Sequence, residues 1–471
     1  MPTLEDIRTR LEAVNQAHLL AFIDTLDASP KEQLLAQIEA AEPETFPSLV
    51  ETYVKNKPLA DLPAGVEPAP YYALAGDWDR AAARNAGEDL LRAGKVACFT
   101  VAGGQGSRLG YDGPKGCYPA TPLSHKPLFQ VFAESIRKAS SLFGKPIPWA
   151  IMPSDLNHDA TVAFFAQHKH FGLDPADVIF FPQGSMPAFD RSTGNVLLAA
   201  KDALALTPDG HGGSIRALHR SGTLDALRAR GIEHLSYFQV DNATVKPVDP
   251  VFLGLHVAAA DSSGEMSSKI VAKTDAAEKV GLFCNIDGRT AVVEYSDMPV
   301  ERQQETNPDG SLKFNGGSIA IHAMSLDFLS RVATNPDYAL PFHRADKKVP
   351  YCEPTSGEIV QPAEPNAVKL EMFVFDALPL AKRSIVLETD RVEEFAPIKN
   401  AEGNDSPATS TALQTERAAR WLEARGVSIP RSSDSTPACT IEISPLTATD
   451  PAHLEGIDLP EEIEAGSEVL L

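Results

Sequence analysis

A short apolar run that ends in a cluster of glycines constrains this chain more than any other feature. The run, Val96–Val101, is rich in β-forming residues and has the length of a buried strand in a parallel sheet. Three glycines between positions 103 and 106 then allow positive φ and close approach of the backbone to a ligand. Arg108 and Lys115 follow in the same stretch. Backbone N–H groups beside fixed positive charge are what polyphosphate recognition requires, so the stretch predicts a phosphate-binding loop.

Two better-known phosphate loops do not fit this stretch. The dinucleotide pattern G-x-G-x-x-G fails because Leu109 stands where the third glycine belongs. The Walker A pattern needs a Lys followed by Ser or Thr, whereas Lys115 is followed by Gly116. A glycine-rich turn without a ligand is the alternative, and two cations at this spacing disfavour it.

Charge and cysteine content exclude several classes of protein. The net charge of −22 argues against a nucleic-acid surface, which would need a basic stripe. No apolar run approaches the ~20 residues of a membrane span, and the first residues carry acids without an apolar segment, so neither a membrane protein nor a secretory signal is expected. The five cysteines are scattered without a CxxC pair, which predicts neither a zinc site nor a disulfide framework. A reducing cytoplasm is the expected compartment.

The order of apolar patterns predicts three consecutive regions. Residues 1–94 are expected to form a helical N-terminal region that contains a proline-rich linker at 58–70. Residues 95–390 alternate strand-like and helix-like segments, which predicts an α/β domain with a mostly parallel sheet. Residues 391–471 predict a small C-terminal domain, in which the acidic segment 455–468 is expected to be frayed or loosely docked.

The expected elements place polar residues at the ends of strands. The expected strands cover 96–101, 147–152, 178–181, 234–240, 268–273, 281–286, 290–295 and 439–443. The expected helices lie within 4–42 and over 128–143, 160–171, 214–230 and 412–425. Binding residues in such sheets gather at the carboxyl ends of strands, where the glycine loop, Gln183 and Asp241 stand.

Two of these polar positions, and a second glycine-rich loop, have chemistry suited to a nucleotide. The amide of Gln183 can donate and accept at the edge of a base, or it can cap a turn. Asp241 can hold Mg²⁺ against phosphate oxygens, since this ion takes only one or two protein carboxylates, or it can cap the next turn. A second glycine-rich loop at 208–213 either contacts a ligand or forms a plain helix start.

The glycine stretch resembles a known signature. Its pattern, G-G-Q-G-S-R-L-G-x-x-x-P-K-G, is similar to that of the UDP-sugar pyrophosphorylases, and most similar to their UDP-N-acetylhexosamine branch. Seven blocks match in order between about residues 15 and 400. The resemblance implies an α/β fold with a central Rossmann-like sheet of the nucleotidyltransferase (GT-A-like) type. That sheet would be mixed but mostly parallel and flanked by helices, with a helical N-terminal part and a small C-terminal α+β part.

The resemblance also implies roles for individual residues. It assigns catalysis to Arg108 and Lys115, and Mg²⁺ binding to Asp241. The nucleotide-binding residues it implies are Gly103, Gly104, Gln183, Gly210 and Lys369. The residues it implies for the sugar phosphate are His211, Glu294, Asn315 and Lys399.

One position departs from the pattern of the favoured branch. The N-acetylhexosamine branch has P-D-G-N-G-G, whereas this chain has His211 in place of the Asn. A histidine at this place resembles the UDP-glucose pyrophosphorylase branch instead. The sugar therefore stays open at this point between an N-acetylhexosamine and glucose.

The expected reaction joins UTP to a hexose 1-phosphate, with N-acetylglucosamine 1-phosphate favoured, and yields a UDP-sugar and pyrophosphate. The same reaction with glucose 1-phosphate is the first alternative. A non-catalytic UDP-sugar-binding protein on the same fold is a remote one, because Arg108 and Lys115 are both present. A glycosyltransferase would want a D-x-D motif, and Ala243 stands where its second Asp belongs.

Overall fold

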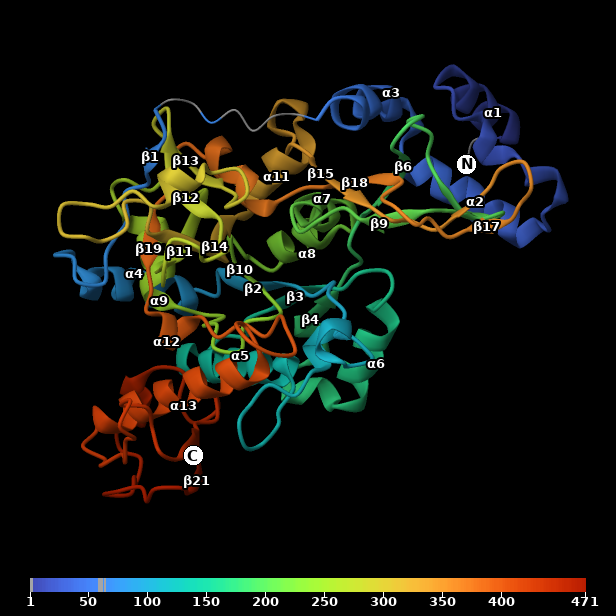
Figure 1. Cartoon of the computed structure of the whole chain (residues 1–471). Helices are drawn as coiled ribbons and strands as arrows, with labels where there is room; N and C mark the ends of the chain where they lie inside the picture. The colour runs from blue at the N-terminus through green and yellow to red at the C-terminus, as the bar shows by residue number, and fades with distance from the viewer. Residues whose placement is uncertain (1–2, 58–61, 63–64) are drawn as a thin grey trace. The chain divides into compact units, whose positions relative to one another are not determined.

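The computed structural model describes residues 3–57, 62 and 65–471 of the chain (Figure 1). Contacts group the chain into two compact units. Unit 1 comprises Met1–Asp61, Gln183–Ser214 and Ala339–Asp376, and unit 2 comprises Leu62–Pro182, Ile215–Tyr338 and Ala377–Leu471. Each unit is made of segments that are far apart in the sequence. The sequence analysis instead predicts three consecutive regions, and the limits of these regions stay a prediction. Most of the first half of the expected linker lies outside the described residues, namely 58–61, 63 and 64.

Unit 2 is built on a ten-stranded mixed sheet. Its main path runs β1-β12-β14-β10-β2-β3-β4, with β11, β13 and β19 paired alongside. The strands on the main path are β1 (Glu67–Pro68), β12 (Leu282–Ile286), β14 (Gly316–Ser325), β10 (His234–Gln239), β2 (Val96–Val101), β3 (Trp149–Met152) and β4 (Val178–Phe180). The others are β11 (Met266–Ala272), β13 (Arg289–Val293) and β19 (Val386–Glu388). The predicted α/β class with a mixed, largely parallel sheet is confirmed.

The parallel part of the sheet explains why the glycine loop stands where it does. β2, β3 and β4 follow one another across the sheet, while β10 pairs with the other edge of β2, from Val96↔His234 to Val101↔Gln239. The strand order therefore reverses between β2 and β10. Ligands of open parallel sheets bind outside the carboxyl ends of strands at such a reversal. The loops after β2 and β10 are the segments that reach this place.

Helices cover this sheet through aromatic side chains. The helices of unit 2 are α4 (Arg80–Arg92), α5 (Leu128–Phe143), α6 (His158–Gln167), α8 (Thr223–Ala229), α9 (Pro250–Ala258), α10 (Val300–Gln303), α11 (Leu326–Thr334), α12 (Arg391–Glu394) and α13 (Pro407–Glu423). Phe129 and Phe132 of α5 meet the Trp149 ring of β3 edge to face, and Phe165 of α6 joins the same group. All four side chains are buried, and large aromatic side chains dominate the energy of such cores.

Unit 1 has a separate core between short helices and small antiparallel sheets. Its helices are α1 (Leu4–Ala13), α2 (Ala28–Ala40) and α3 (Phe46–Leu49). Its sheets are β15-β18-β6 (His343–Lys347, Ala367–Glu371, Phe189–Asp190), β17-β16-β7-β8 (Ile359–Val360, Tyr351–Cys352, Leu198–Ala200, Ala203–Leu204) and β5-β9 (Ser185–Pro187, Leu206–Pro208). Ile7, Leu34 and Phe46 of the helices pack with Phe189 and Val368 of the strands.

The acidic C-terminal segment differs from the expectation. It was expected to be frayed or loosely docked, and this is wrong. β21 (Glu468–Leu470) pairs in parallel with β20 (Thr440–Glu442), Ile463 is buried, and the Ser428 and Ile463 amides donate to carbonyls at Glu461 and Ser428. A strand pairing and one apolar anchor hold the segment although its composition is acidic.

Other element predictions hold within a few residues. The helix expected over 128–143 is α5, with the same limits. The hairpin predicted at Asp287-Gly288 is confirmed, since both residues have positive φ (50° and 79°), as a type I′ turn requires. The helix expected over 214–230 is interrupted by Gly222 at φ 74°, which separates α7 (Gly213–Arg220) from α8. Over the described residues, no helix has both the length and the apolar character to cross a membrane.

Candidate active site

The glycine loop after β2 closes on itself. The Lys115 amide donates to the Gly104 carbonyl (3.0 Å), and the Gly106 amide donates to the Gly113 carbonyl (2.9 Å). A Cβ on Gly106 would lie 2.8 Å from the Tyr111 ring, so only glycine fits at this position of the loop. Gly104 is exposed at the top of the loop. The loop therefore presents bare backbone to solvent on a rigid base, which is the arrangement that phosphate oxygens need.

Lys115 lies across this loop and close to three other predicted residues. Its Cε stands 3.8 Å from the point that a Cβ on Gly104 would occupy. Burial lowers the pKa of Lys115, Asp241 opposes this, and the nearby charges of Lys399 and Arg108 lower it further. The structure thus brings Asp241, Lys399 and Arg108 within electrostatic range of Lys115, near the carboxyl ends of β2 and β10. Lys115, Asp241 and Lys399 are half-buried and Arg108 is exposed.

The buried side-chain amide of Asn157, which the sequence analysis missed, hydrogen-bonds the backbone of the glycine loop. Asn157, at the start of α6, donates from Nδ2 to the carbonyls of Gly103 (3.3 Å) and Gly104 (3.1 Å). The Ser154 hydroxyl donates in turn to Asn157 Oδ1, which fixes the orientation of the amide. Asn157 is 1% exposed. The only sequence signal was a polar Pro-Ser-Asp-Leu-Asn segment after a predicted strand, and such segments are common.

The Asp241 loop is held by a segment from much later in the chain. The Ile398 amide donates to the Asp241 carbonyl (2.8 Å), and the Ala243 amide donates to the Ala396 carbonyl (3.3 Å). Lys399 is the next residue along, and its own amide donates to the Asp405 carbonyl (2.6 Å). This short antiparallel pairing places the predicted metal ligand and a predicted phosphate contact side by side.

The predicted sugar residues of unit 2 lie in different surroundings. A Cβ on Gly281 would be 3.5 Å from Glu294 Oε1 and 3.8 Å from Ser318 Cβ, so these two side chains flank the same glycine. Asn315 instead accepts the Lys273 amide at Oδ1 (3.0 Å). It lines a cavity of about 250 Å³. The shared sugar role of Glu294 and Asn315 stays a prediction.

In unit 1, the predicted uridine residues surround a buried carboxylate. Gln183 donates from Nε2 to the Gly210 carbonyl (2.9 Å) and to Asp209 Oδ1 (3.4 Å). Gly210 has φ 83°, and a Cβ there would lie 2.3 Å from the Met372 carbonyl oxygen, so the turn requires glycine. Asp209 is buried and lies four residues before α7 begins. The amide nitrogen of Gln183 is therefore committed to its own loop, which leaves its oxygen as the group suited to a base edge.

His211 is held as a neutral ring. It stacks on Phe373 with 5.1 Å between centroids and 11° between planes, and its Nδ1 accepts the Val374 amide (3.0 Å). Burial, and secondarily the charge of His343, lowers the pKa of His211 to about 4. Because Nδ1 is an acceptor, the neutral ring carries its proton on Nε2 and can donate from there. Lys369, the remaining predicted residue, lies on β18 opposite Ala345 and is half-buried.

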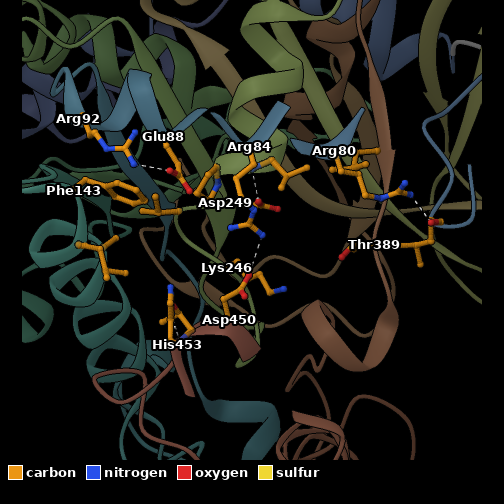
Figure 2. A pocket seen from close by; sticks show the side chains of 18 of the residues that line it. Arg80, Arg84, Glu88, Arg92, Phe143, Lys246, Asp249, Thr389, Asp450 and His453 are labelled. Atoms are coloured by element: carbon orange, nitrogen blue, oxygen red, sulfur yellow. Dashed lines mark hydrogen bonds and ion pairs between the residues drawn. The ribbon is translucent and has the colours of Figure 1, made fainter. Parts of the chain in front are cut away.

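A cavity of about 390 Å³ in unit 2 contains none of the predicted residues (Figure 2). The residues Arg80, Arg84, Glu88 and Arg92, which follow one another at intervals of four along α4, line it. The cations there have partners already: Arg92 pairs with Glu88 (2.6 Å) and Arg84 with Asp450 (3.3 Å). The glycine loop therefore stays the predicted phosphate site.

Comparisons with known proteins identify the family of the chain. The family model described as UTP–glucose-1-phosphate uridylyltransferase matches residues 48–424. The chain is 38% identical to the UDP-N-acetylhexosamine pyrophosphorylase-like protein 1 of Homo sapiens, over 97% of this chain and 95% of that protein. It is 34% identical to the UDP-N-acetylglucosamine pyrophosphorylase of Saccharomyces cerevisiae, over 90% and 92% of the two chains.

A solved structure agrees as well. The uridine diphosphate N-acetylglucosamine pyrophosphorylase of Trypanosoma brucei, crystallised with an inhibitor, superposes with a TM-score of 0.82 at 25% identity, covering 100% of this chain and 99% of that one. The resemblance inferred from seven sequence blocks is thus confirmed over nearly the whole chain. The chain belongs to the UTP–glucose-1-phosphate uridylyltransferase family, the UDP-sugar pyrophosphorylases that its glycine loop predicts.

Proposed function

We propose that this uridylyltransferase converts UTP and N-acetylglucosamine 1-phosphate into UDP-N-acetylglucosamine and pyrophosphate. The observation that carries the proposal is the placement of Lys115 over the exposed Gly104 backbone, within range of Arg108, Asp241 and Lys399. Three cations and one carboxylate around a bare glycine loop suit a bound polyphosphate. The relatives named as N-acetylhexosamine and N-acetylglucosamine pyrophosphorylases support the choice of sugar.

The chemistry needs alignment and charge more than it needs a nucleophile from the protein. A phosphate oxygen of the sugar 1-phosphate forms a bond to the α-phosphorus of UTP, while the bond to the oxygen bridging the α- and β-phosphorus atoms breaks. Pyrophosphate leaves with that electron pair. Lys115 is assigned to the charge near the reacting phosphorus, and exposed Arg108 to the departing β- and γ-phosphates. Preorganised cations of this kind stabilise the transition state without reorganising.

Asp241 fits a Mg²⁺ ion that is shared with the substrate. Among the described residues, no group of three or more His, Cys, Asp and Glu side chains could hold a metal ion alone. Mg²⁺ in phosphoryl-transfer sites is usually held by one or two carboxylates together with substrate phosphates and water. When bound, the ion would neutralise phosphate charge. Asp241 would be its protein ligand, and Lys399 beside it is assigned to the sugar phosphate.

The residues of unit 1 keep the roles that the resemblance assigns to them. Gln183 and Gly210 are proposed for uridine, Lys369 for phosphate and His211 for the sugar. A neutral His211 that donates from Nε2 suits a hydroxyl or a carbonyl oxygen equally well. This is the observation that keeps glucose 1-phosphate as the second candidate substrate. We also propose a cytoplasmic location and no nucleic-acid partner, in keeping with five free buried cysteines and the charge of −22.

Pyrophosphate release tests the proposal directly. The purified protein is assayed with UTP and Mg²⁺, and with N-acetylglucosamine 1-phosphate or glucose 1-phosphate in parallel. We expect the higher kcat/KM with the N-acetylated sugar. A clear preference for glucose 1-phosphate would move the assignment to the second candidate. Binding of UDP-sugar without any pyrophosphate release would instead support the non-catalytic alternative.

A further inference from the structure

A buried cation with two carboxylate partners lies behind the Asp241 loop. Lys269 of β11 is 1% exposed, and its Nζ lies 2.6 Å from Asp249 Oδ2 and 2.6 Å from both carboxylate oxygens of Glu394. Burial by itself would lower the pKa of Lys269, but the two carboxylates outweigh it and the pKa is raised. Burial would likewise raise the pKa of Asp249, but Lys269 and Lys246 bring it down to about 2. Lys269 and Asp249 are therefore both ionised at neutral pH.

Glu394 is the member of this cluster that reaches the active site. Its Oε2 accepts the Thr389 hydroxyl (2.9 Å), and its Oε1 accepts the Lys246 amide (3.4 Å) as well as Lys269. Its main-chain carbonyl accepts Nδ2 of Asn242 (2.7 Å). With a side chain 1% exposed, Glu394 is held at both its carboxylate and its backbone. The end of α12 is thus fixed against the residue that follows Asp241.

Asn242 completes the connection. Its Oδ1 accepts the Ala396 amide (3.0 Å), so one side chain binds the backbone on both sides of Phe395. The two residues beyond Ala396 bring the Ile398 amide to the Asp241 carbonyl (2.8 Å). Asn242 is 4% exposed, so water does not substitute for these bonds. Every contact in this chain from Lys269 to Asp241 is within hydrogen-bonding distance.

Stability is a weak explanation for such a cluster, because desolvation of buried charges offsets much of their attraction. The position of the cluster behind the Asp241 loop offers a better explanation.

We propose that Glu394 is a positioning residue for uridylyl transfer. Paired with Lys269, it anchors Asn242, and through Asn242 it fixes Asp241 and Lys399 relative to each other. The inference rests on the roles proposed above for Asp241 and Lys399. Partners behind a metal ligand commonly set its affinity and orientation in this way.

The same cluster can be approached from the cavity in Figure 2. Lys246, Asp249 and Thr389 line that cavity, and all three contact the buried cluster at Glu394 or Lys269. Thr389→Val therefore removes one hydrogen bond to Glu394 without changing any buried charge and with little change of shape. It provides a mild variant in case substitution of Glu394 prevents folding.

The test compares Glu394→Gln with a matched control, Glu265→Gln, beside β11, the strand that carries Lys269. Glu265 directly precedes β11, is 8% exposed and pairs with Arg331 (2.9 Å), so Glu265→Gln also neutralises a buried acid. For Glu394→Gln we expect kcat/KM to fall about 10- to 100-fold, and the Mg²⁺ concentration for half-maximal activity to rise. Thr389→Val should shift both quantities in the same direction by less. Glu265→Gln should shift neither.

A double-mutant cycle separates positioning from general destabilisation. Because Glu394 and Asn242 act through one connection, the loss in Glu394→Gln/Asn242→Ala should be close to the larger single loss. Glu265→Gln/Asn242→Ala should instead show additive losses. Additive losses in the first pair, with an unchanged Mg²⁺ requirement in Glu394→Gln, would overturn the proposal.

Hydrogen exchange provides a readout that does not depend on activity. The Ala396 and Ile398 amides should exchange faster in Glu394→Gln than in wild type and in Glu265→Gln, and equal exchange in all three would count against positioning. If the wild-type protein releases no pyrophosphate from UTP with either sugar phosphate, the proposed function fails, and the exchange data still test the connection by itself.

Discussion

The main-chain N–H of Ile398 donates to the main-chain carbonyl of Asp241 at 2.8 Å, although the two residues are 157 positions apart in the sequence. This bond ties the loop after β10 to the segment that carries Lys399. The hydrogen bond from Ile398 thus fixes the backbone of Asp241, whose carboxylate lies within electrostatic range of Lys115. Preorganisation of this kind is what a site for charge neutralisation requires.

Asp241→Ala should lower kcat/KM about 100-fold or more, because the proposed Mg²⁺ loses its protein ligand. Added Mg²⁺ should restore part of the activity, since the substrate phosphates still bind the ion. The measurement is pyrophosphate release across a range of Mg²⁺ concentrations. Asp327→Asn, which changes an exposed acid paired with Arg228, serves as the control. An unchanged metal requirement in Asp241→Ala would contradict the assignment.

Removal of either cation of the glycine loop should slow turnover strongly. We expect Lys115→Ala and Arg108→Ala each to lose about 100-fold or more in kcat, because each removes positive charge that acts on the transition state. Lys145→Ala, at an exposed lysine elsewhere in unit 2, should retain wild-type activity. Near wild-type turnover in both loop variants would contradict the catalytic assignment.

The pKa of Lys115 predicts the alkaline side of the pH profile. Burial favours the neutral amine and lowers its pKa, so the charged form is lost at a lower pH than for an exposed lysine. In the free enzyme, kcat/KM should therefore decline as the pH rises through this lowered pKa. Lys115→Arg should extend the plateau to higher pH, because a guanidinium stays charged. The profile is measured by pyrophosphate release between pH 7 and 10, and coincident profiles would exclude Lys115 as the titrating group.

His211 should affect stability in acid but not the charge of the site at neutral pH. Its pKa in the folded protein is about 4, whereas a free histidine titrates near pH 6.5. Between these values the unfolded chain binds a proton that the folded chain does not. The free energy of unfolding should therefore fall more steeply in wild type than in His211→Asn as the pH drops from about 6.5 towards 4. Urea titrations at pH 7, 6 and 5 measure this difference, and parallel curves would argue against a buried neutral ring.

His211→Asn also tests sugar choice. We expect the variant to raise the ratio of kcat/KM for N-acetylglucosamine 1-phosphate over glucose 1-phosphate, because Asn is the residue of the N-acetylhexosamine pattern. Both sugars are assayed in the same preparation with saturating UTP. A ratio that does not change would place sugar selection elsewhere in the chain.

Asn157→Asp should weaken UTP binding, and we expect the KM for UTP to rise about tenfold. The substitution keeps the shape of the side chain but replaces an N–H donor with an oxygen that repels the carbonyls of Gly103 and Gly104. Asn56→Asp, at an exposed amide of unit 1, is the matched control. A KM for UTP that moves equally in both variants would exclude a specific role for Asn157.

Local patterns predicted much of the fold. The strand before the glycine loop, the α5 helix and the Asp287-Gly288 hairpin follow from apolar periodicity and turn chemistry, which act over a few residues. The same rules failed for the acidic C-terminal segment. Its composition indicates fraying, while the pairing of β21 with β20 and the burial of Ile463 depend on contacts outside the segment.

The candidate site divides in the same way. The glycines, Arg108, Lys115 and Asp241 stand in contiguous motifs whose chemistry is evident without a structure. Asn157, Asn242, Lys269 and Glu394 are single polar residues in ordinary sequence surroundings. Each acquires its hydrogen-bond partners only when folding buries it against distant parts of the chain. A motif needs only neighbours along the chain, whereas a buried hydrogen bond needs partners whose distance the local sequence does not specify. The glycine loop could therefore be identified from the sequence, but the side chains that hold it and its Asp241 neighbour in place emerged only from the tertiary structure.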